Sequence, residues 1–176
     1  MRSVTITGKH NIDQMNKVKM NEIGNTTYKA VRKHMTSLDE SVLVHSSQLD
    51  MLCKLYIIGP DYVADHRSLF LSELTHKIQG YKGQDLKKEI QHVISMEDVL
   101  AKLVGSHLTC GYCSKPIYVL YKNVRDPMQW TLDRIDNALG HTSENTCIAC
   151  LKCNLQRRLM NADKFSFTKK LKIQKV

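Results

Sequence analysis

The sequence contains no long hydrophobic run, and this absence excludes a membrane-spanning helix. Crossing a bilayer takes about 18–20 consecutive apolar residues, whereas apolar stretches such as Leu55–Ile58 are far shorter. The N-terminus also lacks the hydrophobic segment of a secretory signal peptide. We therefore expect a soluble intracellular protein of the cytoplasm or nucleus, which is not secreted and has no membrane partner.

Acidic residues are also in short supply. Asp and Glu total 17 against 26 Lys and Arg, so the 176-residue chain carries a net charge of +9 with its histidines neutral. Such an excess suits a polyanionic partner, most often a nucleic acid, but does not define a fold. The hydrophobic fraction of 42% is sufficient for a packed core and argues against wholesale disorder.

The pattern of apolar residues divides the chain into three parts and predicts an α+β protein. Residues 1–36 are rich in polar and charged side chains, which is typical of a flexible arm, with one short strand at Val4–Thr7. Residues 37–105 have helical periodicity and predict a helical region of unknown role. Residues 106–176 contain β-branched and aromatic runs followed by a basic tail, and predict a separate module.

Individual elements follow from the periodicity and from helix start and stop signals. In the helical region we expect a helix ending at Gly59-Pro60, a helix over Asp61–Gln79 stopped by Gly80, a helix marked by Leu86, Ile90, Val93 and Ile94, and a helix begun by the capping pair Ser95 and Asp98. In the module we expect strands at Ile117–Tyr121, Gln129–Ile135 and Thr146–Ala149, then a helix with Leu151, Leu155 and Leu159 on one face.

Five of the six cysteines lie in the last part of the chain, which favours metal ligands over a secreted disulfide framework. Cys110 and Cys113 form one C-x-x-C pair, and Cys150 and Cys153 form another. Two such pairs can supply the four thiolates of a tetrahedral zinc ion. Four protein ligands leave no open position for water, so this zinc would be structural.

Cys147 offers an alternative, because it forms a further C-x-x-C pair with Cys150. An iron–sulfur cluster would require another cysteine and a proline downstream, and neither is present. We interpret Cys147 as a buried strand thiol outside the metal site.

The residues between the two cysteine pairs resemble a known family. Trp130–Asn137 is followed by Gly140-His141, by Glu144-Asn145, and by Asn154 directly after the last cysteine. This order resembles the HNH endonucleases, also called ββα-metal or His-Me finger nucleases, and within them the zinc-containing branch that includes phage recombination endonuclease VII. The resemblance covers about residues 108–160.

The resemblance implies a zinc-stapled ββα-metal nuclease module. Asp133 matches the catalytic aspartate that binds metal, and Asn154 matches the second metal-ligand position. Both offer oxygen, which suits Mg²⁺ or Mn²⁺ better than zinc. Asn145 matches the asparagine that supports the catalytic loop. The implied activity is metal-dependent cleavage of DNA, on branched or structured substrates, by a protein that works as a homodimer.

The sequence departs from the family at its general base. The family has a histidine directly after the aspartate, and this chain has Arg134. Arginine stays protonated and cannot accept a proton from water, but its guanidinium suits a phosphate contact. The nearest candidate base is His141, because imidazole titrates near neutrality. Asp136 is a candidate for an additional metal ligand.

Basic residues are concentrated from Leu151 onward, where Lys152, Arg157 and Arg158 precede further lysines. Together with Arg134, these three are expected to contact DNA phosphates, which give affinity without sequence choice. The main rival hypothesis is a nucleic-acid-binding zinc module that has lost its general base and does not cut. A zinc-stabilised protein-interaction adaptor is a further alternative, but it leaves the basic tail unexplained.

Overall fold

The computed structural model describes residues 30–90 and 93–171. The chain divides into compact units between Ala30 and Val31, and every described helix and strand belongs to the unit that begins at Val31. The strand expected at Val4–Thr7 lies outside the described residues. The elements, in chain order, are η1 (Lys33–Met35), α2 (Glu40–Leu43), α3 (His45–Ile58), η2 (Gly59–Asp61), α4 (Arg67–Leu86), α5 (Met96–Gly105), β1 (Trp130–Arg134), β2 (Thr146–Cys150), α6 (Leu151–Arg157) and α7 (Ala162–Lys170).

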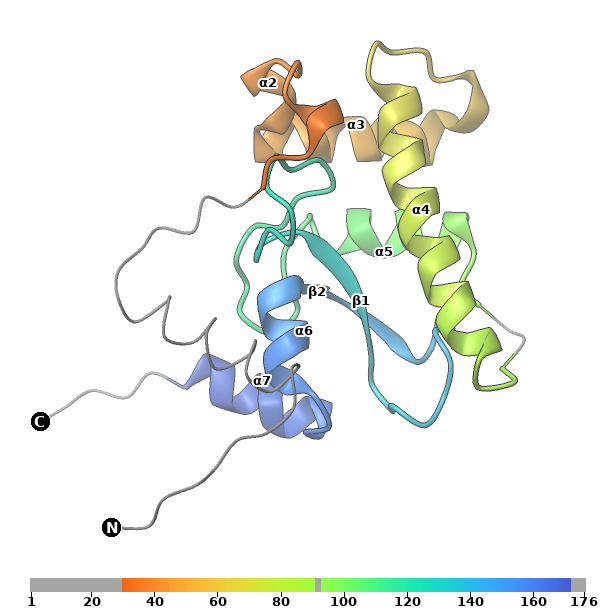
Figure 1. Ribbon diagram of the computed structural model, residues 1–176, viewed down its shortest axis with the longest axis vertical. Helices are drawn as coiled ribbons and strands as arrows, with labels where there is room; N and C mark the ends of the chain where they lie inside the picture. Colours follow the sequence, from red (N-terminus) through yellow and green to blue (C-terminus); the bar gives the residue numbers. More distant parts are fainter. Residues whose placement is uncertain (1–29, 91–92, 172–176) are drawn as a thin grey trace, which may run out of the picture. The chain divides into compact units, whose positions relative to one another are not determined.

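The expected α+β class is confirmed, with helices around a small antiparallel sheet of β1 and β2 (Figure 1). Trp130 pairs with Cys150 at one end of the sheet, and Arg134 pairs with Thr146 at the other. The helices up to Gly105 and the module that contains the sheet share one hydrophobic core, which extends from Met35 to Phe165. The chain from Val31 onward is therefore one compact unit, with no separation at residue 105.

Two helix boundaries lie where local signals place them. Helix α3 ends at Gly59, whose φ of 69° is a conformation that glycine adopts without a Cβ clash. Helix α5 begins with the expected capping box, in which Ser95 and Asp98 bond reciprocally to each other's backbone amides. No described helix has the length and apolar character required to cross a bilayer.

Helix α4 differs from the prediction at both ends. It begins at Arg67 and continues through Gly80 and Gly83 for 20 residues. Two glycines cost a helix about 2 kcal/mol, and contacts of α4 with β1, such as the Tyr81 hydroxyl that accepts from the Leu132 amide, outweigh that. Among the described residues after Leu86, the predicted third helix is absent. The chain turns instead, and the Asp85 carbonyl accepts from the Lys88 and Ile90 amides.

The predicted strand at Ile117–Tyr121 is also wrong. Ile117, Val119 and Leu120 of this segment are buried, and the segment makes one isolated bridge, from Tyr118 to Gln129. The fully buried Gln48 side chain of α3 takes the place of a partner strand. Its Oε1 accepts from the amides of Val119 at 2.8 Å and Leu120 at 3.0 Å, and its Nε2 donates to the Leu120 carbonyl at 3.0 Å. A buried backbone needs hydrogen-bond partners, but these need not come from a sheet.

Candidate metal centre and adjoining pocket

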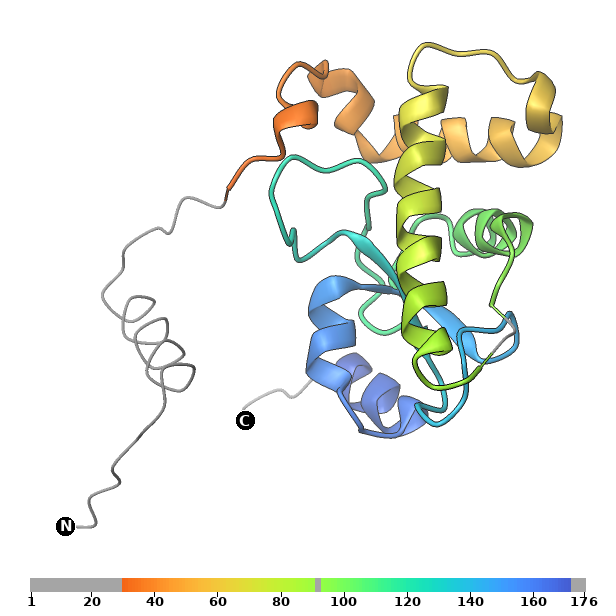
Figure 2. The ribbon, with the colours of Figure 1, turned by 45° about the vertical axis from the view of Figure 1, so that its right-hand side comes forward.

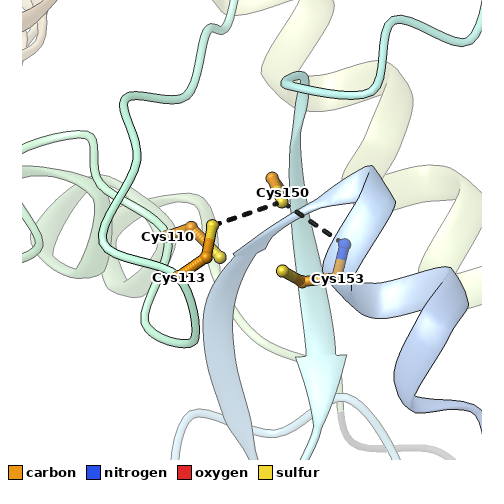
Figure 3. Close-up of side chains that lie close together, drawn as sticks. All are labelled: Cys110, Cys113, Cys150 and Cys153. Atoms are coloured by element: carbon orange, nitrogen blue, oxygen red, sulfur yellow. Dashed lines mark hydrogen bonds between the residues drawn. The ribbon is translucent and has the colours of Figure 1, made fainter. Parts of the chain in front are cut away.

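The four predicted cysteines converge at one end of the sheet (Figure 3). Their sulfur atoms all lie within 4.8 Å of one another, and the Sγ atoms of Cys113 and Cys150 are 4.0 Å apart. A tetrahedral zinc with Zn–S bonds near 2.3 Å would place its sulfurs about 3.8 Å apart. The cluster can therefore hold a metal ion such as zinc without rearrangement of the chain.

Backbone contacts bring the two cysteine pairs together. The Gly111 amide donates to the Ile148 carbonyl at 2.9 Å, which joins the first pair to β2. A Cβ at Gly111 would lie 3.2 Å from that carbonyl oxygen, so the approach requires a small residue. In the second pair, Cys150 caps α6 by accepting from the Cys153 amide at 3.3 Å.

Contacts and burial within the cluster shift the pKa values of three of its thiols. A hydrogen bond from the Cys150 thiol lowers the pKa of Cys110, and the same bond raises the pKa of Cys150. Burial raises the pKa of Cys153. A metal ion must displace the protons that these thiols retain, so metal affinity falls as the solution becomes acidic.

Cys147 lies outside this cluster. Its half-buried thiol donates to the Tyr112 hydroxyl at 3.3 Å, and that hydroxyl donates to Oδ2 of Asp133 at 2.7 Å. Burial raises the pKa of Cys147, so the thiol form is favoured. Cys147 is part of a polar network beneath β1.

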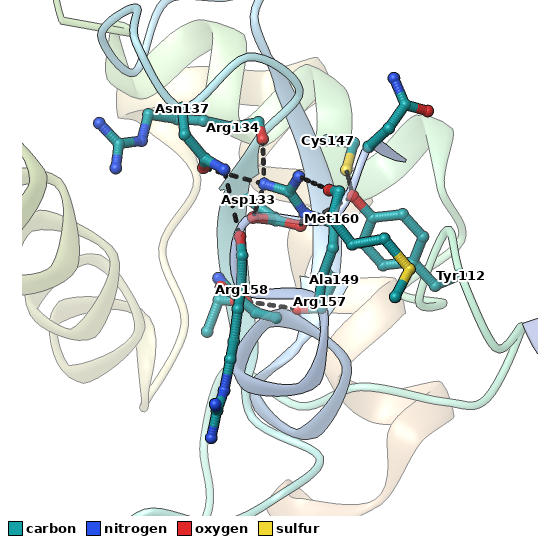
Figure 4. Close-up of polar contacts among 12 residues, drawn as sticks. Tyr112, Asp133, Arg134, Asn137, Cys147, Ala149, Arg157, Arg158 and Met160 are labelled. Carbon is teal, nitrogen blue, oxygen red and sulfur yellow. Dashed lines mark hydrogen bonds and ion pairs between the residues drawn. The ribbon is translucent and has the colours of Figure 1, made fainter. Parts of the chain in front are cut away.

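Asp133, the predicted catalytic metal ligand, is buried at the end of β1 with both carboxylate oxygens engaged (Figure 4). Arg157 donates from Nε to Oδ2 at 2.5 Å and from Nη2 to Oδ1 at 2.9 Å. Tyr112 supplies the third hydrogen bond. Within the described ranges, the four cysteines are the sole group of three or more His, Cys, Asp or Glu placed to hold a metal. The donors in this arrangement therefore do not fit Mg²⁺ or Mn²⁺.

Arg157 requires a correction, because it cannot serve as the phosphate contact that its sequence position suggests. It is only 2% exposed. Besides Asp133, its guanidinium bonds the Met160 carbonyl at 2.7 Å, the Asn137 Oδ1 at 3.1 Å and the Arg134 carbonyl. These contacts tie α6 to β1 and to the loop after β1, which is a structural role.

Five of the predicted residues, from three separate segments, meet at one pocket. The pocket has a volume of about 560 Å³ and is lined by side chains of α4, β1, α6 and the loop after β1. The predicted residues that line it are Asp133, Arg134, His141, Asn154 and Arg158. Helix α4 adds Tyr81 and Gln84, and Lys88 follows just after the helix. Lys152 is exposed on α6 and does not line the pocket.

His141 is held by a residue that sequence reasoning missed. Its Nδ1 lies 2.8 Å from Oδ1 of Asp85, and its backbone amide donates to Oδ2 of Asp85 at 2.7 Å. The Tyr81 ring lies 4.5 Å away, centroid to centroid. Burial lowers the pKa of His141, and the bond to Asp85 offsets part of this effect. With Nδ1 donating to the carboxylate, Nε2 is the ring nitrogen left to accept a proton.

Two asparagines organise the surroundings. Asn145 accepts from the Asp136 amide through Oδ1 and donates through Nδ2 to the carbonyls of Asp136 and Gly140, each at 2.9 Å. These contacts clamp the loop between β1 and His141. Asn154 donates to Thr131 Oγ1 at 3.1 Å and to the Leu132 carbonyl at 3.3 Å. Its side chain is thereby oriented on the pocket wall.

Comparisons of the chain with protein-family models, curated proteins and solved structures found no match.

Proposed function

We propose that this protein is a DNA endonuclease of the ββα-metal type, with a structural zinc in the four-cysteine cluster. The observation that carries the proposal is the convergence of Asp133, Arg134, His141, Asn154 and Arg158 on one pocket. These residues come from β1, from the loop after it and from α6 with its C-terminal cap, within a module whose elements run strand, strand, helix. The cysteine cluster lies where β2 joins α6, so a zinc there would hold the pocket walls in place.

The charge of the pocket supports a phosphodiester substrate. Lys88, Arg134 and Arg158 contribute three cationic side chains to the lining. Among the described lining residues the sole carboxylate is Asp133, and Arg157 already neutralises it. A net positive pocket attracts a phosphate backbone, and arginine suits its oxygens through paired N–H donors.

His141 is the proton acceptor in this proposal. Asp85 holds the imidazole through Nδ1 and favours the tautomer with Nε2 free to accept a proton from the attacking water. Arg134 and Arg158 would bind the phosphate oxygens as negative charge develops on them. The requirement for Mg²⁺ or Mn²⁺ is implied by the family resemblance alone, because the donors at Asp133 do not fit such an ion.

One observation favours the rival function. The Asp133–Arg157 pair occupies the position where the family would bind its catalytic metal, and Arg134 replaces the usual base. A protein with these features can bind nucleic acid through the same basic pocket without cutting it.

Cleavage assays separate the two functions. The protein would be incubated with plasmid and with four-way-junction DNA without added divalent metal, with Mg²⁺ and with Mn²⁺. We expect cleavage by the wild type and its loss in Asn154→Ala, since Asn154 lines the pocket. Gln156→Ala is the matched control on α6, because Gln156 is exposed, lies outside the pocket and bonds Lys169. Binding without cleavage in every metal would refute the endonuclease and leave the binding module.

A further inference from the structure

A second hollow continues from the proposed active pocket along α4. It has a volume of about 330 Å³ and shares Tyr81, Gln84 and Thr131 with that pocket. Beyond these residues it extends to His76, Lys77 and Gly80 of α4 and to Tyr121 and Gln129 on the opposite wall. The two hollows lie next to each other between α4 and the β1 region, and together we call them the groove. Tyr81, whose hydroxyl accepts from the Leu132 amide at 2.9 Å, lines both hollows, and Figure 2 shows α4 passing alongside the sheet.

One side of the groove is a single face of α4. His76, Gly80 and Gln84 follow one another at four-residue intervals, which places them in a row on the helix, and Lys88 lies in the turn just after it. From His76 to Gln84 the row extends about 12 Å at the rise of an α-helix. This length corresponds to roughly three to four nucleotides at about 3.4 Å per base step.

The composition of the groove fits a polyanionic strand. Lys88, Arg134 and Arg158 lie at the active-pocket end, and the continuation adds Lys77, His76, two glutamine amides, the Thr131 hydroxyl and two tyrosines. No acidic side chain lines the described continuation. Uncharged donors and aromatic faces along a basic channel are how proteins bind a nucleic-acid strand without sequence preference.

We propose that this groove is the path of the DNA strand beyond the cleavage point, with α4 as one wall. This inference rests on the proposed function. Helix α4 belongs to the region whose role the sequence left open. The proposal assigns that region to substrate binding: it positions the strand while the β1–β2–α6 module supplies the reacting groups.

Two glycines of α4 provide a matched test. A Cβ at Gly80 or at Gly83 would meet nothing within 4 Å, and both lie inside the helix. Gly80 lines the groove and Gly83 does not. A longer side chain at Gly80 would therefore enter the groove, whereas the same side chain at Gly83 would not. Glutamine favours a helix more than glycine does, so neither Gly80→Gln nor Gly83→Gln should destabilise the fold.

The experiment measures the affinity of both variants for labelled four-way-junction DNA by fluorescence anisotropy in buffer without added Mg²⁺ or Mn²⁺. We expect Gly80→Gln to raise Kd about tenfold and Gly83→Gln to leave it unchanged, with thermal stability retained in both. DNA trimmed close to the cleavage point should bind wild type and Gly80→Gln equally, since it does not reach the groove. Equal affinity of both variants for the full junction would refute the strand path. Absence of binding by the wild type would refute the proposed function itself.

Discussion

Arg157 and Asp133 form a buried bidentate ion pair that joins α6 to the end of β1. The two residues are 24 positions apart in the chain, and each is nearly inaccessible to solvent. The family resemblance implies that the Asp133 carboxylate binds a metal, and the position of Arg157 in the basic tail suggests a DNA contact. In the structure these two groups bind each other instead. Removal of either partner leaves an uncompensated charge in the core, so activity lost by substitution at Asp133 would not by itself identify a catalytic residue.

Substitution of Arg157 should destabilise the fold. We expect Arg157→Ala to lower the free energy of unfolding by about 3–5 kcal/mol, because Asp133 would remain buried without its counterion. Arg158→Ala is the control, since the neighbouring side chain is exposed and should change stability by less than about 0.5 kcal/mol. Urea denaturation measures both. Equal stabilities of the two variants would show that the ion pair contributes nothing.

Removal of a single cluster cysteine should release the metal. We expect metal analysis to find about one zinc per chain, in keeping with four thiolate ligands per ion, and Cys110→Ser to lose it together with much of the thermal stability. Cys147→Ser should retain the zinc, because Cys147 bonds Tyr112 outside the cluster. Loss of zinc from both variants, or from neither, would contradict the assignment.

Acid should release the same zinc, because zinc binding displaces protons from the cysteine thiols. Free thiols bind protons that the metal-bound thiolates do not, so falling pH favours the metal-free protein. Zinc release followed with a chromogenic chelator should therefore increase as pH falls. A release profile that does not change with pH would be inconsistent with thiolate ligands.

The buried Lys77 should make stability increase with pH. Burial lowers the pKa of Lys77 to about 7, with Glu73 opposing and Arg32 reinforcing the shift. Between pH 7 and 10.5 the unfolded chain thus binds the proton more strongly than the folded one. The free-energy cost of burying Lys77 grows as pH falls through this window, with a slope of at most about 1.4 kcal/mol per pH unit. Lys77→Met should remove that slope from unfolding measurements, and an unchanged slope would refute the shift.

The Asp85–His141 contact should appear in the pH dependence of cleavage, if the protein cleaves DNA. Asp85 raises the pKa of His141 against the effect of burial. Asp85→Asn should therefore move the acid limb of the kcat/KM profile to lower pH and reduce the rate. Glu97→Gln, which removes an exposed carboxylate, should leave the limb in place. A slower variant with an unmoved limb would show that Asp85 only supports the fold.

Lys88 and its neighbour Lys87 distinguish pocket charge from general surface charge. Both are exposed, but only Lys88 lines the pocket, where it donates to the Asn137 carbonyl at 3.3 Å. We expect Lys88→Ala to weaken DNA binding and to reduce the salt dependence of log Kd by about one unit of slope. Lys87→Ala should bind as the wild type does. Equal effects would mean that DNA does not enter the pocket.

Local signals predicted many of the elements and much of the pocket. The capping pair Ser95 and Asp98 starts α5, Gly59 ends α3, and β1, β2 and α6 form close to the expected positions. The two helix ends depend on residues a few positions apart, so local chemistry is sufficient there, whereas β1 and β2 also need each other, with Trp130 pairing to Cys150. The strand predicted at Ile117–Tyr121 failed because its apolar pattern indicates burial but does not reveal that Gln48 satisfies the backbone.

By itself, the sequence determined which four cysteines can share one metal ion, because C-x-x-C spacing turns two thiols toward one point wherever the chain forms such a turn. It also determined the excess of positive charge. Only the tertiary structure decided how that charge is used: Arg157 is buried against Asp133, while Arg158 faces the pocket. It likewise paired His141 with Asp85 across 56 positions. The physical reason is that the partner which neutralises a charge or holds a proton is selected by packing, which brings distant segments together.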